Sequence, residues 1–484
     1  MSRNYTFLFV TAVLVGTTVF SGIAMHRAAA QTSGITGSWE GKLVIPQGTL
    51  RVVFHIAQSD SAYTATMDSP DQGAFGIPVS SVTVNGESVT IQVAVVGGSY
   101  GGTIINDSTM AGTWSQGPGN LPLRLVLQPD DANEPDNDSE GDPEASSSVD
   151  VPYDSRDVEF ENPIDGITLA GTLTLPEGNG PYPAVILVSG SGAQDRDETI
   201  FGHKPFRVMA DHLTREGIAV LRYDDRGVGE STGIFAEGTI ELFANDAESA
   251  VAFLKGRTDI DPDRIGMLGH SEGGIIAPIV QQRSGGLSFM VLLAGPAIPG
   301  KNILLEQAQL ILAANGATSE QVESNTDLQK QLFAILDTQA EGDELEGLLR
   351  QLLRQAASEM TEEERTSSGF TDANIELQLM TLTSPWFRHF VSYDPAPALA
   401  SLECPVLALF GEKDLQVPSE SNMSVISEII AANESLTLDA RVLPGLNHLF
   451  QTAESGSPSE YQQISESISP IALNEISSWI QSQL

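Results

Sequence analysis

The chain has 484 residues, of which 41% are hydrophobic, and its 64 acidic residues against 24 Lys and Arg give a formal net charge of −40. So acidic a chain lacks the cations that neutralise phosphate backbones, which excludes nucleic acid as a partner. Its single cysteine, Cys404, excludes an intramolecular disulfide and a multi-cysteine metal cluster. We expect two or three domains and neither a metal nor a cofactor.

Residues 1–30 are typical of an export signal. Arg3 gives a positive start, residues 7–25 are uncharged and mostly apolar, and residues 28–30 (AAA) offer a small-residue cleavage site. The alternative is an uncleaved membrane anchor, because 19 apolar residues are long for a signal core and could just span a bilayer. On either interpretation the rest of the chain is expected to be exported, to the periplasm or the extracellular space.

Residues 31–128 have the pattern of an all-β domain. Alternating apolar and polar residues predict strands, and Asn85-Gly86 and Gly101-Gly102 are expected to form tight turns. The predicted strands are 50–56, 88–93 and 121–127. Nothing in this stretch has the period of a helix, so we predict a small antiparallel barrel or sandwich. His55 alternates with apolar neighbours and is interpreted as a structural strand residue.

A linker is predicted over residues 129–154. Its first 22 residues, 129–150, hold nine acids, three prolines and no base. Such a composition cannot bury enough apolar surface to offset the entropy lost on ordering. We therefore expect an acidic, disordered segment.

Residues 155–484 alternate short apolar runs with helical patterns. Two short β segments, 158–161 and 167–175, come first. Further strands are predicted at 184–188, 218–223, 265–268, 289–293, 406–410 and 437–443, and helices at 206–215 and 239–257. Continuous apolar strands separated by helices indicate a parallel sheet covered on both faces.

Residues 269–273 (GHSEG) form a G-x-S-x-G motif between a predicted strand and a predicted helix. In that context the serine lies on a strained turn that exposes its hydroxyl, and the two glycines leave room for crowded backbones. Ser271 is therefore the candidate nucleophile. The alternative, a helix N-cap role for Ser271, is also open.

A serine hydroxyl needs a base, and a triad on such a turn follows the order Ser, acid, His. Six of the seven histidines lie in the signal, in the β-domain, before or beside the serine, or in the cap region described below; they are His26, His55, His203, His212, His270 and His389. Elimination leaves His448 as the candidate base. Asp414, just after the strand 406–410, is the candidate acid, with Glu412 and Asp439 as alternatives.

An oxyanion hole requires two backbone N–H donors. One is expected from Glu272, the residue after the nucleophile. The other is expected from the loop that follows the strand 184–188, where Ser191 is the first choice and Gly192 the second.

Residues 155–484 resemble the α/β-hydrolase superfamily, especially its secreted serine-hydrolase branch of esterases and S33/S9-like peptidases. The resemblance rests on five motifs, namely 189–198 (SGSGAQDRDE), 224–231 (DDRGVGES), 269–273 (GHSEG), 411–414 (GEKD) and 447–448 (NH). It implies that Arg226 takes part in a structural ion pair. The sequence lacks the His-Gly-Gly oxyanion segment of lipases, which counts against long-chain lipase activity.

An insertion at about 300–399 separates the last two predicted strands from the rest of the sheet. It contains amphipathic runs at 303–314, 345–357 and 373–382 and an aromatic cluster at 386–390. By resemblance this is a helical cap that closes over the serine and shapes the substrate pocket, and most of its apolar stripes are expected to form the cap's own core. Segments 37–41, 68–73 and 112–117 of the β-domain resemble an accessory module ahead of some secreted hydrolases, which suggests contact with the cell envelope.

Three functions are consistent with these residues. The first is an exported serine hydrolase that cleaves small carboxylic esters. The second is a serine aminopeptidase-like enzyme of the same fold that acts on short peptides, because amide and ester cleavage share this machinery. The third is an envelope binding protein with an inactive hydrolase domain.

The charge distribution predicts a protein adapted to saline surroundings (halophilic). Without residues 1–30 the net charge is −42, of which residues 151–484 hold −30. Like charges on one compact body repel over about 30 Å in 0.01 M salt but only about 3 Å in 1 M salt. The melting temperature should therefore rise from dilute buffer to molar NaCl. A flat or falling melting temperature would contradict salt adaptation.

Overall fold

The computed structural model describes ten stretches of the chain, which form two compact units. They are residues 35–45, 48–59, 62–69, 74–86, 88–93, 98–106, 108–116, 119–128, 151–432 and 436–484. The predicted signal at 1–30 and most of the predicted linker, residues 129–150, lie outside the described residues. In the part that is described, no helix has the length and apolarity needed to cross a bilayer.

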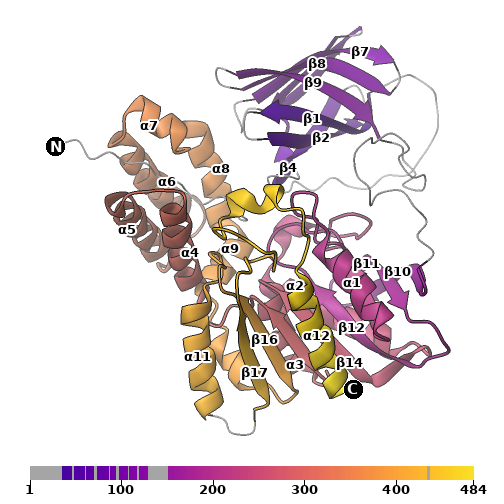
Figure 1. Ribbon diagram of the computed structural model, residues 1–484. Coiled ribbons are helices and arrows are strands. Elements are labelled where there is room, and N and C mark those ends of the chain that lie inside the picture. Colours follow the sequence, from indigo (N-terminus) through magenta and orange to yellow (C-terminus); the bar gives the residue numbers. More distant parts are fainter. Residues whose placement is uncertain are drawn as a thin grey trace. The chain divides into compact units, whose positions relative to one another are not determined.

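The N-terminal unit is a closed antiparallel barrel (Figure 1). Its strands are β1 Gly37–Ile45, β2 Gly48–Ser59, β3 Ala62–Ser69, β4 Ala74–Pro78, β5 Ser81–Asn85, β6 Ser88–Val93, β7 Gly98–Asn106, β8 Thr109–Gln116 and β9 Gly119–Leu127. They pair in the order β2-β1-β9-β8-β7-β6-β5-β3, β2 also pairs with β3, and β4 extends from β3. The structure thus selects the barrel over the sandwich.

Large side chains fill the barrel, so it is a packed core rather than a channel. Trp39, Phe54 and Tyr100 are at most 1% exposed. The ring centroids of Phe54 and Trp114 lie 6.2 Å apart. Eight strands leave an interior just wide enough for such a filling. On the opposite face, His55 Nε2 lies 2.6 Å from Asp68 Oδ2.

One predicted turn of the β-domain is wrong and the other is confirmed. Gly86, with φ +62°, follows Asn85 between β5 and β6, as expected. Gly101 and Gly102 instead lie within β7 and pair with β6 and β8. A Cβ on Gly102 would come within 2.3 Å of the Tyr100 hydroxyl oxygen. This glycine therefore makes room for a side chain rather than for a turn.

The second unit contains an eight-stranded sheet in the order β10-β11-β13-β12-β14-β15-β16-β17. The strands are β10 Asp154–Asn162, β11 Ile167–Leu175, β12 Tyr182–Val188, β13 Ala219–Tyr223, β14 Ile260–His270, β15 Met290–Leu293, β16 Val406–Gly411 and β17 Leu438–Leu443. The pairs β10–β11 and β11–β13 are antiparallel, and all later pairs are parallel. This is the mostly parallel sheet that the apolar runs predict.

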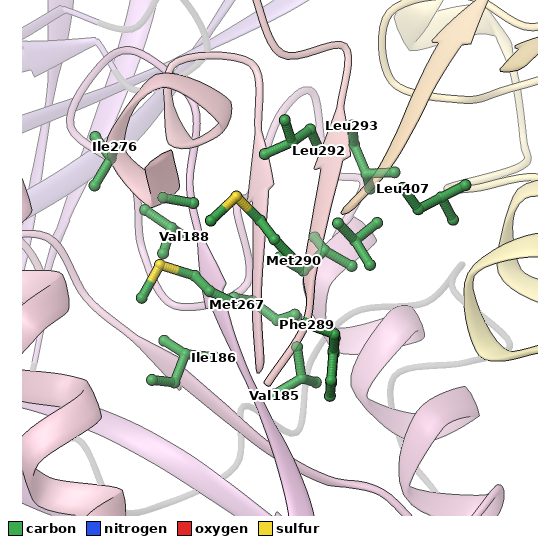
Figure 2. Close-up of a cluster of buried hydrophobic side chains, with 14 of the residues drawn as sticks. Val185, Ile186, Val188, Met267, Ile276, Phe289, Met290, Leu292, Leu293 and Leu407 are labelled. Carbon is green, nitrogen blue, oxygen red and sulfur yellow. The ribbon is translucent and has the colours of Figure 1, made fainter. Parts of the chain in front are cut away.

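Helices pack against this sheet and bury its side chains. The main ones are α1 Pro205–Arg215, α2 Ile240–Lys255, α3 Gly273–Ser284, α11 Ser419–Ala432 and α12 Pro470–Gln483. Helix α1 packs against β11 and β13, whereas α2 and α3 pack against β12 and β14. Figure 2 shows the centre of the core, where Val185, Met267 and Met290 are fully buried. Strands covered by helices on both faces have continuous apolar sequences.

Between β15 and β16 the chain is helical, as the cap resemblance implies. The helices are α4 Gly300–Ala314, α5 Ser319–Leu336, α6 Gly342–Ser358, α7 Glu362–Ser367, α8 Asp372–Thr383, α9 Pro385–Ser392 and α10 Ala396–Ala400. Helix α5 is absent from the sequence prediction. Its start carries a capping box between Thr318 and Gln321, a signal that could have revealed it.

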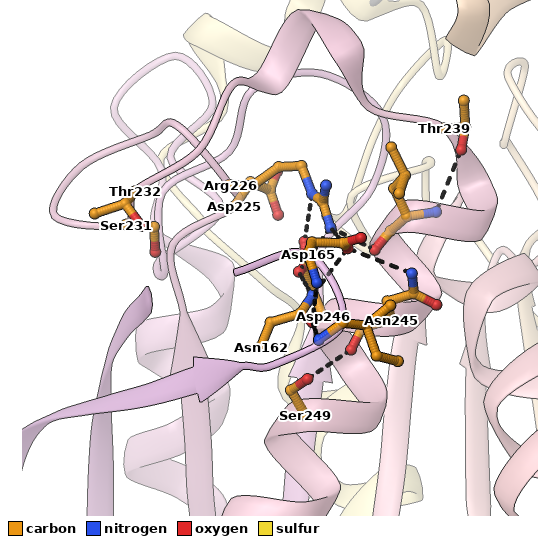
Figure 3. A network of polar contacts seen from close by, with 12 residues as sticks. Asn162, Asp165, Asp225, Arg226, Ser231, Thr232, Thr239, Asn245, Asp246 and Ser249 are labelled. Atoms are coloured by element: carbon orange, nitrogen blue, oxygen red, sulfur yellow. Dashed lines mark hydrogen bonds and ion pairs between the residues drawn. The ribbon is translucent and has the colours of Figure 1, made fainter. Parts of the chain in front are cut away.

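The expected ion pair of Arg226 is confirmed (Figure 3). Its Nε lies 2.7 Å from Asp246 Oδ2 on α2, and its Nη2 lies 2.7 Å from Asp165 Oδ2 on the β10–β11 turn. Asn162 donates a further hydrogen bond to Asp246 over 2.7 Å. The side chains of Arg226 and Asp246 are only 6% and 2% exposed. Pairing compensates the cost of burying these charges, and the network fixes the 224–231 loop beside the sheet.

Candidate active site

Ser271 occupies a strained turn between β14 and α3. Its φ is +51°, in the left-handed region that residues other than glycine rarely adopt. Two close approaches explain the flanking glycines: a Cβ on Gly269 would lie 2.0 Å from the Gly273 carbonyl oxygen, and one on Gly273 would lie 2.2 Å from that of Val188. The N-cap of α3 is Glu272 rather than Ser271, and it makes no side-chain cap hydrogen bond.

His448 is paired with Asp414. The Nδ1 of His448 lies 2.8 Å from Asp414 Oδ2, and the two side chains are 6% and 0% exposed. The other carboxylate oxygen, Oδ1, accepts hydrogen bonds from the backbone N–H groups of Gln416 and Val417 over 2.8 and 2.9 Å. Asp414 is thereby held in one orientation and fixes the imidazole.

The two alternative acids have other partners. Glu412 accepts a hydrogen bond from the backbone N–H of Gly445, and Asp439 forms an ion pair with Arg441. Asp414 is therefore the acid that the geometry joins to His448.

The candidate residues meet at one pocket. Ser271, His448, Glu272 and Ser191 all line it, and Asp414 lies behind His448. Apolar side chains from the cap form much of the remaining wall: Ile303, Leu304, Trp386 and Phe390. The other lining residues are Pro296, Gln307, Gln416 and Val417.

The loop after β12 supplies amides beside the nucleophile. Gly190 is close enough that a Cβ on it would lie 3.2 Å from the Cβ of Ser271, but its N–H already donates to Glu198 Oε1 over 2.7 Å. Within residues 151–432 and 436–484, no protein group accepts a hydrogen bond from the N–H of Ser191 or of Glu272. Gly192 lines a neighbouring cavity instead of this pocket. The geometry thus favours Ser191 over Gly192 as the second donor.

The side chain of Glu272 has a role that sequence reasoning missed. Its carboxylate accepts a hydrogen bond from Trp386 Nε1 over 2.7 Å and another from the Ser191 side chain. Trp386 in turn stacks on Phe390, with ring centroids 5.4 Å apart. Glu272 therefore ties the cap to the nucleophile turn and to the oxyanion loop. The aromatic cluster at 386–390 was the only sequence signal of this contact.

Burial raises the pKa of Glu272 to about 7, although the hydrogen bonds from Trp386 and Ser191 favour the ionised form. In the unfolded chain the carboxyl ionises near 4.5, whereas in the folded protein it keeps its proton to about pH 7. The folded state binds more protons in that window, so this group makes stability fall as the pH rises through it.

We predict that Glu272→Gln removes this loss, because an amide does not ionise and still offers an oxygen to Trp386. As the pH rises from 4.5 to 7, the free energy of unfolding of the variant should increase relative to that of the parent by about 3 kcal/mol. Urea denaturation followed by the helical circular dichroism signal measures the difference at each pH. A difference that stays constant across the range would contradict the assignment.

Comparisons with known proteins agree with this architecture. The family model for X-Pro dipeptidyl-peptidases (S15 family) matches residues 165–437, which include Ser271 and Asp414 but end before His448. Esterase EstD of Thermotoga maritima is 29% identical over 315 residues, which are 64% of this chain and 65% of EstD. Thiohydrolase aneE of Aspergillus aculeatus is 35% identical over 122 residues, which are 25% of this chain and 35% of aneE. The chain thus spans less than two thirds of the length of either relative.

Two solved structures show a more distant likeness. The Pyrococcus furiosus esterase Pf2001 has a TM-score of 0.41 at 15% identity and covers 70% of this chain and 93% of its own. Est1E of Butyrivibrio proteoclasticus, solved with ferulic acid, has a TM-score of 0.38 at 16% identity and covers 67% of this chain and 98% of its own. With the sheet, the nucleophile turn and a family model that spans more than half of the chain, this α/β-hydrolase belongs to the X-Pro dipeptidyl-peptidase (S15) family.

Proposed function

We propose that the protein is an exported serine hydrolase that cleaves carboxylic esters through an acyl-enzyme on Ser271. The observation that carries the proposal is the meeting of Ser271, the His448–Asp414 pair and two amides without protein acceptors at one pocket. Asp414 accepts a hydrogen bond from the Nδ1–H of His448, which leaves Nε2 as the basic nitrogen that faces the reaction.

The steps follow from these positions. Ser271 Oγ attacks the ester carbonyl while its proton passes to Nε2 of His448, and the Glu272 and Ser191 amides hold the oxyanion. The intermediate expels the alcohol, which takes the proton from His448. Water then attacks the acyl-enzyme with His448 as base again, and the acid and free Ser271 are regenerated.

The pocket wall favours esters over peptides with a free amine. A peptidase that grips a substrate's amine needs carboxylates aimed at it. Among the described residues that line the pocket the only carboxylate is Glu272, and it already accepts hydrogen bonds from Trp386 and Ser191. The cap contributes apolar side chains and Gln307. The name of the relative EstD, an esterase, points the same way, whereas the name of the S15 family supports the peptidase alternative.

We predict that p-nitrophenyl esters of short acyl groups are turned over and that aminoacyl and X-Pro anilides are not, because the described residues of the cap place no carboxylate in the pocket wall. Parallel assays of the two substrate series at equal concentrations measure the preference. Turnover of anilides alone would establish the peptidase instead.

The binding-protein alternative predicts an inert serine. An active-site fluorophosphonate should label the parent and not Ser271→Ala, because only an activated serine reacts at a useful rate. Labelling that persists in Ser271→Ala, or none in the parent, would contradict the enzyme assignment.

We further propose that the chain works outside the cytoplasm and that the barrel contacts the cell envelope. The first proposal is supported by the sequence of residues 1–30, and the second by the position of the barrel before the linker.

A further inference from the structure

One buried carboxylate close to the catalytic residues has none of the catalytic roles described above. Glu198, in the loop between β12 and α1, is 1% exposed and has a φ of +52°. Its Oε1 accepts the hydrogen bond from the Gly190 N–H over 2.7 Å and lies 2.8 Å from His270 Nδ1. A strained backbone and a buried charge both cost stability, so the surroundings must hold this side chain firmly.

His270 connects that carboxylate to the loop of the general base. Its Nε2 lies 3.0 Å from the backbone carbonyl oxygen of His448, and its ring centroid lies 4.9 Å from that of His448. A carboxylate and a carbonyl can only accept, so both ring nitrogens of His270 donate and the ring is an imidazolium. Burial lowers the pKa of His270, but the charge and hydrogen bond of Glu198 and the His448 carbonyl more than compensate and leave it raised.

We propose that Glu198 and His270 are positioning residues of the catalytic centre, a buried ion pair that holds three catalytic segments in register. These segments are the oxyanion loop at Gly190, the nucleophile turn that begins at His270, and the loop that carries His448. The inference rests on the proposed serine hydrolase function. Neither side chain touches the reacting atoms in this scheme; each acts through backbone groups that do.

The pair also sets the charge around the base. Asp414 faces His448 from the loop after β16, His270 faces it from the end of β14, and Glu198 lies on the far side of His270. Glu272, two residues after His270 on the nucleophile turn, lines the same pocket. Loss of the imidazolium removes a positive charge 4.9 Å from the ring of the general base, so the acidic limb of the kcat/KM profile should move to higher pH.

Four variants test the proposal against the parent: Glu198→Gln, His270→Gln, the double variant, and the control His212→Gln. Gln at 198 keeps an acceptor for the Gly190 N–H but removes the charge that holds His270. His212 is matched in residue type, and its Nε2 bonds to Ser477 on α12, away from the pocket. The readouts are the rate at which a fluorophosphonate labels Ser271, and kcat, KM and the pH profile with a p-nitrophenyl ester.

Each single variant should lower kcat and the labelling rate roughly 10- to 100-fold, because small displacements of reacting groups have effects of that size. KM should change by less than about twofold, since the pair does not touch substrate, and the acidic limb should move up in pH. The double variant should be no slower than the slower single, because the two residues act as a unit. His212→Gln should match the parent.

The two ways of failing can be told apart. A parent that the fluorophosphonate does not label overturns the proposed function, and this inference with it. A labelled parent whose Glu198 and His270 variants label equally fast, or keep the parent's pH profile, overturns the inference alone. Losses that multiply in the double variant also overturn it. If only one of the two single variants folds, its comparison with the parent still tests the inference.

Discussion

The site depends on one crowded turn. Ser271 can face the pocket only because the chain reverses from β14 into α3 within a few residues at a positive φ. That reversal brings the backbones of Gly269 and Gly273, and of Gly273 and Val188, closer than any Cβ would allow. A strained residue persists only where its neighbours determine its conformation, and here the neighbours are the two central strands of the sheet and the helix packed on them. The rigidity of the buried core is thus what keeps the hydroxyl exposed.

The other catalytic residues lie at the same edge of the parallel sheet. Loops that follow β12, β14, β16 and β17 all leave the carboxyl ends of parallel strands of one sheet, so residues far apart in the chain converge there. Asp414 and His448 come from two of these loops, and Ser191 from a third. The cap adds the apolar wall, and the Trp386–Glu272 hydrogen bond fastens it to the turn. We propose that Glu198 and His270 link three of these segments through hydrogen bonds.

Much of this could be predicted from the sequence because the signals are local. Continuous apolar runs placed the buried strands, and the G-x-S-x-G motif with the order of acids and histidines selected Ser271, Asp414 and His448. Features that depend on contacts between residues far apart in the sequence could not be predicted. Gly101-Gly102 reads as a turn because a glycine that makes room for Tyr100 looks the same in sequence as one that bends the chain. The role of Glu198 could not be inferred, since its partners Gly190 and His270 are set by folding, although the 189–198 motif contains it.

The proposed mechanism requires that Ser271 carries the acyl group during turnover. The most direct measurement is to mix the protein with a p-nitrophenyl ester, quench it within the first turnover, and locate the added acyl mass among its peptides. We expect the mass on the peptide that contains Ser271, no such mass in Ser271→Ala, and its disappearance as the substrate is exhausted. Acyl mass on a different residue, or continued turnover by Ser271→Ala at the parent's rate, would contradict the proposed mechanism.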